Sequence, residues 1–239
     1  MVESLTEQDE WDAEAKAARH ESSFVGNEIN VLHSEIFSEI HCRQIADLVQ
    51  KAKHFWIPRG NNTFYTIGAS TYNDSVMPGD EDFYYLVAKN NNPILEQGFG
   101  QYLAHVKAAV EKIYQREVID LPLAGLIGFH IFDSTAVGTH GHIHTDEPFQ
   151  RLFWVEPFSQ PFSFTVAIAL PDGRGGFDYW DREDQMFHYP YKIGHIYLHH
   201  GRMPHRISSP VQPSDENPRI TIQGHGAILE DSNRVAVYF

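Results

Sequence analysis

The chain has 239 residues, a formal net charge of −14 and a hydrophobic content of 42%. A chain of this length and apolar content can bury a large core, and an all-β barrel of this size is often one domain. The negative charge opposes binding to a phosphate backbone, which depends on Lys and Arg contacts. We therefore expect one domain over residues 1–239 that does not bind nucleic acid.

The sequence also indicates a compartment. No apolar run reaches the roughly 18–20 residues that span a bilayer, and the first residues are acidic where a secretory signal would be basic and then apolar. Because Cys42 is the single cysteine, no internal disulfide can form, as is usual in a reducing compartment. We expect a cytoplasmic protein with no membrane partner; the sequence does not indicate its oligomeric state.

The helices are predicted in the first half of the chain. Residues 1–25 are charged and mostly polar, which predicts a mobile acidic tail. A strand is expected over residues 30–32, and residues 38–55 carry apolar side chains at helical spacing. A further strand is predicted over residues 63–72, between loop-forming stretches. A second helix is predicted over residues 93–115, where one side is apolar and should pack on the rest of the domain.

The second half of the chain has a different pattern. Short β-rich runs alternate with clusters of Gly, Pro, Asp and Asn, which predicts antiparallel strands joined by turns. The runs are residues 123–132, 162–170, 195–200, 220–229 and 235–239. We therefore predict a mainly β (α+β) fold, a double-stranded β-helix of the jelly-roll or cupin-like kind, with the earlier helices packed outside the barrel.

The stretch HGHIHTDE contains a candidate metal motif. Residues two apart in a strand point the same way, so His144 and Asp146 can reach one ion. With His205 they would supply two imidazoles and one carboxylate, a set that leaves positions of an octahedral ion open for chemistry. His140 and His142 share the same face, and either could replace His144. The residues thus predict a metal site without settling which histidines form it.

The order of the motifs resembles that of the Fe(II)/2-oxoglutarate-dependent dioxygenases. The chain has His-x-Asp at residues 144–146, a Gly-Gly pair at 175–176, a distal His205 in MPHRI, and Arg-x-Thr at 219–221. Their spacing is typical of that family. The resemblance covers roughly residues 120–226 well, and the preceding part only by its strand-then-helix opening. Each motif is short, so the specificity comes from finding all four in this order.

The resemblance implies an oxidoreductase. His144, Asp146 and His205 would bind Fe(II), Arg219 and Thr221 would hold the far carboxylate of 2-oxoglutarate, and O2 would complete the cofactors. The family's reaction releases succinate and CO2 and most often hydroxylates an unactivated C–H bond of a small metabolite. The halogenating branch has a small residue at the position of Asp146. The carboxylate of Asp146 in this chain therefore favours hydroxylation, desaturation or ring closure over halogenation.

The substrate residues rest on weaker signals. His130 lies on the strand before the metal motif, where its side chain could line the pocket. Glu147 follows Asp146 directly and could hold a substrate amine. The small size and this Glu resemble the compact hydroxylases and halogenases of free amino acids, so an amino acid or derivative is the expected substrate class. Residues 148–162 are rich in aromatics and Pro, which predicts a flap over the site or a hydrophobic plug.

Other interpretations remain open at this point. His199 or His200 could be the distal ligand, although both precede the turn that the family places before it. Arg219 could form an ordinary surface ion pair. The sequence His-Ile-His at 142–144 begins like a cupin motif, so a cupin-type metal dioxygenase or isomerase without 2-oxoglutarate is the alternative enzyme. A barrel that binds a ligand without turnover is the alternative outside catalysis.

Overall fold

The computed structural model describes most of the chain. The described residues are 31–60, 64–75, 81–136, 142–146, 152, 158–171, 174–181, 184–208, 213–230 and 232–239. The expected tail over residues 1–25 lies outside them, so the division of the chain into tail and domain stays a prediction. Within the described part, no helix is both long and apolar enough to span a bilayer.

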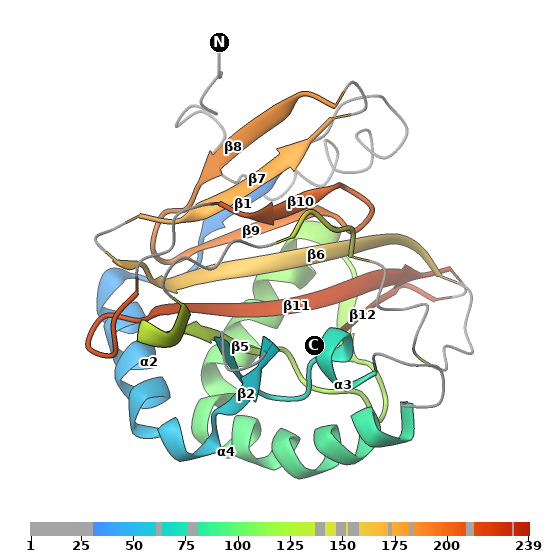
Figure 1. Ribbon diagram of the computed structural model, residues 1–239. Helices are drawn as coiled ribbons and strands as arrows, with labels where there is room; N and C mark the ends of the chain where they lie inside the picture. Colours follow the sequence, from blue (N-terminus) through green and yellow to red (C-terminus); the bar gives the residue numbers. More distant parts are fainter. Residues whose placement is uncertain are drawn as a thin grey trace.

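Two β-sheets face each other (Figure 1). The larger runs in the order β1-β9-β6-β11-β5-β3-β2, and β12 and β4 extend it beside β11. Its strands are β1 (Leu32–Glu35), β2 (Ile57–Arg59), β3 (Phe64–Ile67), β4 (Glu117–Asp120), β5 (Gly128–Phe132), β6 (Phe158–Ala169), β9 (His195–His200), β11 (Arg219–Leu229) and β12 (Arg234–Tyr238). The smaller sheet runs β10-β7-β8, with β7 (Gly176–Trp180), β8 (Met186–Pro190) and β10 (His205–Ile207).

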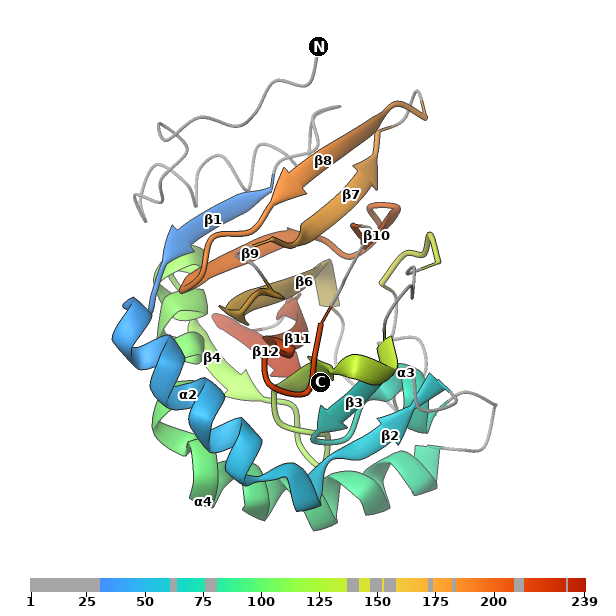
Figure 2. The same cartoon turned by 60° about the vertical axis from the view of Figure 1, so that its left-hand side comes forward.

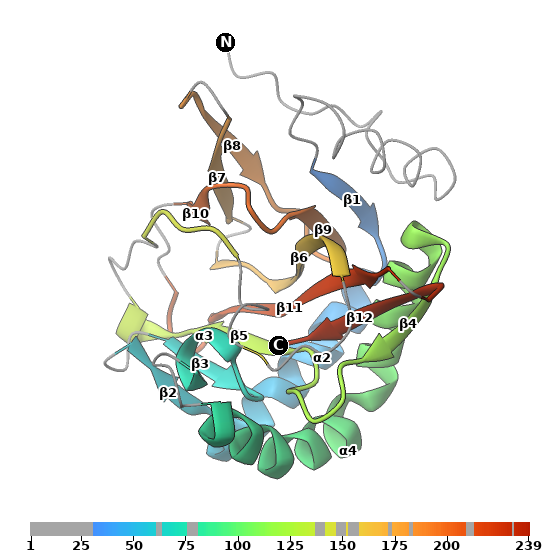
Figure 3. The same ribbon diagram turned by 90° about the vertical axis from the view of Figure 1, so that its right-hand side faces the viewer.

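The strands pair antiparallel except for β12 with β4, which is parallel. Figure 2 shows the small sheet on the opposite side of the barrel from β2 and β3. Figure 3 shows β12 and β4 side by side next to α4. This is the mainly β barrel with external helices that the sequence predicts.

Two helices cover the outer face of the large sheet (Figure 1). Helix α2 (Glu39–Lys51) begins after Ser38, whose hydroxyl accepts a hydrogen bond from the backbone N–H of His41. Helix α4 (Glu81–Tyr114) is the longest element. A one-turn helix, α3 (Thr71–Asp74), and two 3-10 turns, η2 (Lys53–Phe55) and η4 (Ser134–Ala136), complete the described elements.

Two boundaries differ from the sequence prediction. Helix α4 begins at Glu81 and continues through Pro93. The sequence prediction started the helix only at Pro93, because an Asn-rich stretch before a proline favours a break in a helix. The side chain of Asn92 instead bonds another segment: its Nδ2 donates to the Ala124 carbonyl and its Oδ1 accepts from Leu126 N–H. The strand predicted over residues 63–72 ends at Ile67, since Gly68 has a φ of +112° that turns the chain into α3.

The apolar core lies between the large sheet and the helices. On β11, Ile220 and Ile222 point into this core, whereas Arg219, Gln223 and His225 line the opposite, inner face. Alternation along a strand produces this division. The core receives its side chains from α2, α4, β5, β6, β9 and β11, among them Ile45, Val49, Leu95, Val106, Val110, Phe129 and Ile131. Polar side chains are therefore gathered between the two sheets.

Candidate metal centre

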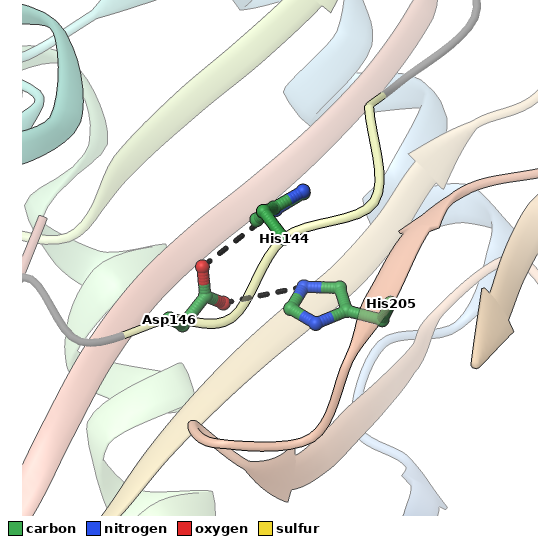
Figure 4. A group of neighbouring side chains, drawn as sticks. All are labelled: His144, Asp146 and His205. Carbon is green, nitrogen blue, oxygen red and sulfur yellow. Dashed lines mark ion pairs between the residues drawn. The ribbon is translucent and has the colours of Figure 1, made fainter. Parts of the chain in front are cut away.

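Three side chains from the predicted motif meet between the sheets (Figure 4). The Nε2 atom of His144 lies 3.7 Å from Oδ1 of Asp146, and Nε2 of His205 lies 3.3 Å from Oδ2. All three ligand atoms lie within 4.8 Å of one another. Two imidazoles and one carboxylate at these separations fit one metal ion bound on a single face.

Backbone hydrogen bonds bring these distant residues together. His144 and His205 form an isolated antiparallel bridge, with N–H to carbonyl distances of 3.0 and 2.9 Å. The N–H of Asp146 donates to the carbonyl of Gly201 at 2.6 Å. A β-carbon at Gly201 would lie 2.5 Å from the carbonyl oxygen of Asp146, so a side chain there would displace the metal motif. The turn between β9 and β10 thus holds both parts of the site.

In each of the two histidines, a hydrogen bond at Nδ1 fixes the tautomer of the ring. Nδ1 of His144 lies 2.7 Å from the carbonyl oxygen of His142, and Nδ1 of His205 lies 2.8 Å from that of Met203. A carbonyl can only accept, so each Nδ1 carries the proton and each Nε2 keeps its lone pair. These contacts orient the rings as outer-shell partners of metal ligands do.

The other histidines that the sequence offered as ligands lie elsewhere. His142 supplies its backbone carbonyl to His144, and its ring is not part of the three-residue cluster. The ring of His199 stacks edge-on against His205, with centroids 4.4 Å apart, and Nδ1 of His200 accepts from the Arg202 N–H. Among the described residues, neither joins the cluster; His140 lies outside them.

The electrostatics of the site favour a cation. Asp146 is buried, which opposes ionisation, but His205 and then His225 and His144 hold its pKa well below the ordinary value. Burial lowers the pKa of His205, and the facing Asp146 reverses this, so that the pKa is raised overall. The Asp146 carboxylate is therefore ionised and stabilises positive charge beside it, which a divalent metal would supply.

Arg219 is a buried cation without an anion. It is 1% exposed, and its guanidinium carbon lies 5.2 Å from the ring centre of Phe132 and 5.8 Å from that of Tyr191. Its Nε and Nη1 atoms have no hydrogen-bond partner among the described residues. Burial lowers its pKa, yet a guanidinium keeps its proton in proteins. Because an unpaired buried charge is costly, the site requires an anionic ligand; with Arg219 buried, the surface ion pair considered for it is not formed with any described residue.

Comparison with known proteins identifies the architecture. No protein-family model and no curated protein matches the chain. Solved structures do: the non-heme alpha ketoglutarate dependent epimerase SnoN from nogalamycin biosynthesis matches with a TM-score of 0.56 and 12% identity, over 90% of this chain and 85% of that chain. The fold is that of the Fe(II)/2-oxoglutarate oxygenases.

Two further structures share this oxygenase fold. The N-substituted L-amino acid dioxygenase from Burkholderia ambifaria AMMD matches with a TM-score of 0.56 and 9% identity, over 93% of this chain and 91% of that one. The carbocyclase SnoK from nogalamycin biosynthesis matches with a TM-score of 0.51 and 11% identity, over 91% and 83%. At these identities the likeness establishes the fold and leaves the reaction to be argued from the site.

The oxygenase fold places the metal cluster and Arg219 in one cavity of about 620 Å³ between the sheets. Sequence analysis missed two residues of its wall, Tyr191 and Thr165. Tyr191 faces the guanidinium and is hydrogen-bonded to Thr165 of β6. Neither residue belongs to a motif, and only the tertiary structure brings both into the cavity that Arg219 lines. Thr221 is buried and its Oγ1 has no hydrogen-bond partner among the described residues, but Thr221 is not among the described residues that line the cavity.

The substrate residues suggested by the sequence are only partly described. His130 of β5 lines the cavity, and burial, followed by the charge of Arg219, lowers its pKa to about 3, so its ring is neutral. Glu147 lies outside the described residues. So does most of the expected flap over residues 148–162, although its last residues, from Phe158 onward, form the start of β6.

Proposed function

We propose that this protein is an Fe(II)/2-oxoglutarate-dependent oxygenase that hydroxylates an unactivated C–H bond of a small molecule. One observation carries this proposal: the buried guanidinium of Arg219, which has no counter-ion among the described residues, shares a cavity with a two-histidine, one-carboxylate cluster. A metal site alone would suit many reactions. A metal site beside an unpaired buried cation suits a metal-bound organic acid.

The residues present fit both groups. His144, Asp146 and His205 offer the nitrogen and oxygen donors of the facial set used by non-haem Fe(II) enzymes. Bound Fe(II) and 2-oxoglutarate would supply, with O2, the oxidation of the C–H bond and the loss of CO2 that leaves succinate.

The side chains near Arg219 then have defined tasks. Its planar guanidinium would bind a carboxylate through two parallel hydrogen bonds. The rings of Phe132 and Tyr191 cover the guanidinium and exclude water, which strengthens that ion pair. The carbonyls of His142 and Met203 keep the two histidine rings oriented with Nε2 toward Asp146.

The alternatives account for less of the site. A cupin-type metal enzyme without 2-oxoglutarate would leave the Arg219 charge unexplained. A binding protein without turnover would have no physical need for an ionised carboxylate, two oriented imidazoles and a buried guanidinium in one cavity. Oxidation of an amino acid or derivative stays a prediction, since the Glu147 expected to hold its amine is not described.

The first test uses Arg219→Ala. Under anaerobic conditions, Fe(II) and then 2-oxoglutarate are added to the metal-free protein, and the visible charge-transfer band of an iron-chelated 2-oxo acid is recorded. We expect the band in the wild type. In Arg219→Ala we expect iron to remain bound, while the concentration of 2-oxoglutarate needed for the band rises by about 100-fold, because one charge-assisted ion pair is lost.

The matched control is Arg43→Ala. Arg43 lies on the exposed face of α2, where it pairs with Glu39, so this variant removes a surface guanidinium and should retain the band. Iron binding by the wild type without a band would favour the cupin or binding-protein alternative.

A further inference from the structure

The charges of the cavity have a definite balance. Apart from histidines, the charged residues among its described lining are Asp146, Arg206 and Arg219. Arg206 already has a partner, because its Nε donates to Oδ2 of Asp178 at 3.1 Å. Its guanidinium carbon also lies 5.3 Å from the ring centre of Trp180. Arg206 therefore offers no unpaired charge to a ligand.

The other two charges, on Asp146 and Arg219, are neutralised by the metal and the 2-oxoglutarate of the proposed function, on which this inference rests. A divalent metal and the Arg219 guanidinium together balance the Asp146 carboxylate and the two carboxylates of 2-oxoglutarate. Over the lining that the structure describes, the loaded cavity then has no net charge. An ammonium or carboxylate on the substrate would lose its hydration there without gaining a counter-ion from any described residue of the lining, which is unfavourable.

The rest of the wall is aromatic and polar but uncharged. Tyr72 of α3 and His225 of β11 form a T-shaped ring pair with centroids 5.5 Å apart. Phe64 of β3 and His130 of β5 form another, at 5.4 Å. Such rings present both edges and faces to a planar ligand.

Neutral hydrogen-bonding groups stand among these rings. Oγ of Ser163 lies 3.0 Å from Nδ1 of His225, which leaves the other ring nitrogen of His225 available to a ligand. Nδ2 of Asn73 donates to Oγ of Ser70, so the amide oxygen of Asn73 is available as an acceptor. Gln223 adds an amide to the same cavity. These groups can donate to a carbonyl or a hydroxyl and accept from a hydroxyl.

We infer that the substrate is an uncharged ring compound bearing hydroxyl or carbonyl groups. Its ring would pack against the paired aromatic side chains, and its oxygen atoms would bond the amides and the imidazole. This class differs from the amino acid that the resemblance suggests, because a free amino acid brings two charges into a cavity whose described charges are already balanced.

The test compares three ligands that share one ring and differ in charge: 4-hydroxybenzyl alcohol, 4-hydroxybenzoate and 4-hydroxybenzylamine. Dissociation constants are measured by ligand-observed NMR on the full chain loaded with Zn(II), which prevents turnover, and with saturating 2-oxoglutarate. We expect the alcohol to bind about tenfold or more tightly than the other two. Tighter binding of the amine or the benzoate, or no binding of any of the three, would overturn the inference.

Omitting 2-oxoglutarate separates this inference from the proposed function. Without it Arg219 is unpaired, so 4-hydroxybenzoate should bind, and 2-oxoglutarate should then displace it. If 2-oxoglutarate itself fails to bind the Zn(II) protein, the proposed function is wrong. If 2-oxoglutarate binds but the charged ligands still bind more tightly than the alcohol, only the substrate class is wrong.

Two variants place a carboxylate in the substrate wall. Asn73→Asp, and independently Gln223→Glu, should move the preference from the alcohol to the amine. Asn90→Asp, at an exposed position on α4, adds the same charge outside the cavity and should leave the order unchanged. An unchanged order in both wall variants, each folded by its melting curve, would contradict the assignment of this wall to the substrate.

Discussion

At the scale of single residues, the metal motif depends on a glycine. Gly201 has no catalytic atom, yet its carbonyl receives the N–H of Asp146, and its missing side chain lets the two backbones approach. The β-carbon of any other residue would lie 2.5 Å from a backbone oxygen that cannot move freely. Conformational freedom is less important here than this close approach.

We expect Gly201→Ala to weaken metal binding by about 10- to 100-fold, the range for disturbed outer-shell contacts. The physical reason is displacement of the Asp146 carboxylate from the two imidazoles. Titration with Co(II), followed by its visible spectrum, measures the affinity. Gly98→Ala is the control: it lies on α4 with no atom within 4 Å of its added β-carbon, and should stabilise the helix without changing metal affinity. Equal Co(II) affinity in both variants would contradict this account.

At the scale of elements, α3 supports the site. A buried ion pair holds the end of this short helix: Arg59 donates to Oδ1 and Oδ2 of Asp74 at 2.5 and 2.7 Å. Thr71, at its start, donates through its N–H and its hydroxyl to the carbonyl oxygen of Phe239. Tyr72 then donates from its hydroxyl to the Thr145 carbonyl at 3.1 Å, between the two residues of the metal motif. A rigid element thus fixes the segment that carries His144 and Asp146.

Removal of this hydroxyl is expected to loosen the motif without unfolding the chain. For Tyr72→Phe we expect Co(II) affinity to fall by roughly tenfold, as for other outer-shell contacts, because the Thr145 carbonyl loses its donor. The melting temperature should change little. Tyr102→Phe removes a hydroxyl from α4, away from the cavity, and serves as the matched control. If the two variants bind Co(II) equally well, α3 does not position the metal motif.

At the scale of the whole molecule, stability and function lie on opposite faces of the large sheet. The outer face is packed against α2 and α4 by apolar side chains, whereas the inner face holds the ionised Asp146 and the unpaired Arg219. Buried charges of this kind destabilise the ligand-free protein. Ligands that neutralise them should therefore stabilise the fold by mass action.

With Zn(II) and 2-oxoglutarate at about 100 times their dissociation constants, we expect a gain of about 2.7 kcal/mol for the second ligand. For a chain of this size that corresponds to a rise in melting temperature of roughly 5–10 °C. Calorimetry measures it, and EDTA should reverse it. The 2-oxoglutarate increment should disappear in Arg219→Ala and persist in Arg43→Ala; an increment of equal size in both variants would place the cosubstrate elsewhere.

The sequence by itself determined the features that local patterns encode. Alternating apolar runs gave the mainly β barrel, helical spacing gave the external helices, and the order of His-x-Asp, His and Arg-x-Thr identified the cluster that the structure assembles from His144, Asp146 and His205. Each of these signals lies within a few neighbouring residues or in the order of short motifs, and so is visible without coordinates.

The tertiary structure alone decided the rest. The tertiary structure buries Arg219 without a counter-ion among the described residues and sets Tyr191 beside it, with Thr165 bonded to Tyr191. Long-range packing also lets α4 continue through the segment around Pro93, and the position of α3 brings Tyr72 to the metal motif. These features depend on contacts between residues far apart in the chain, whose energies no local pattern contains.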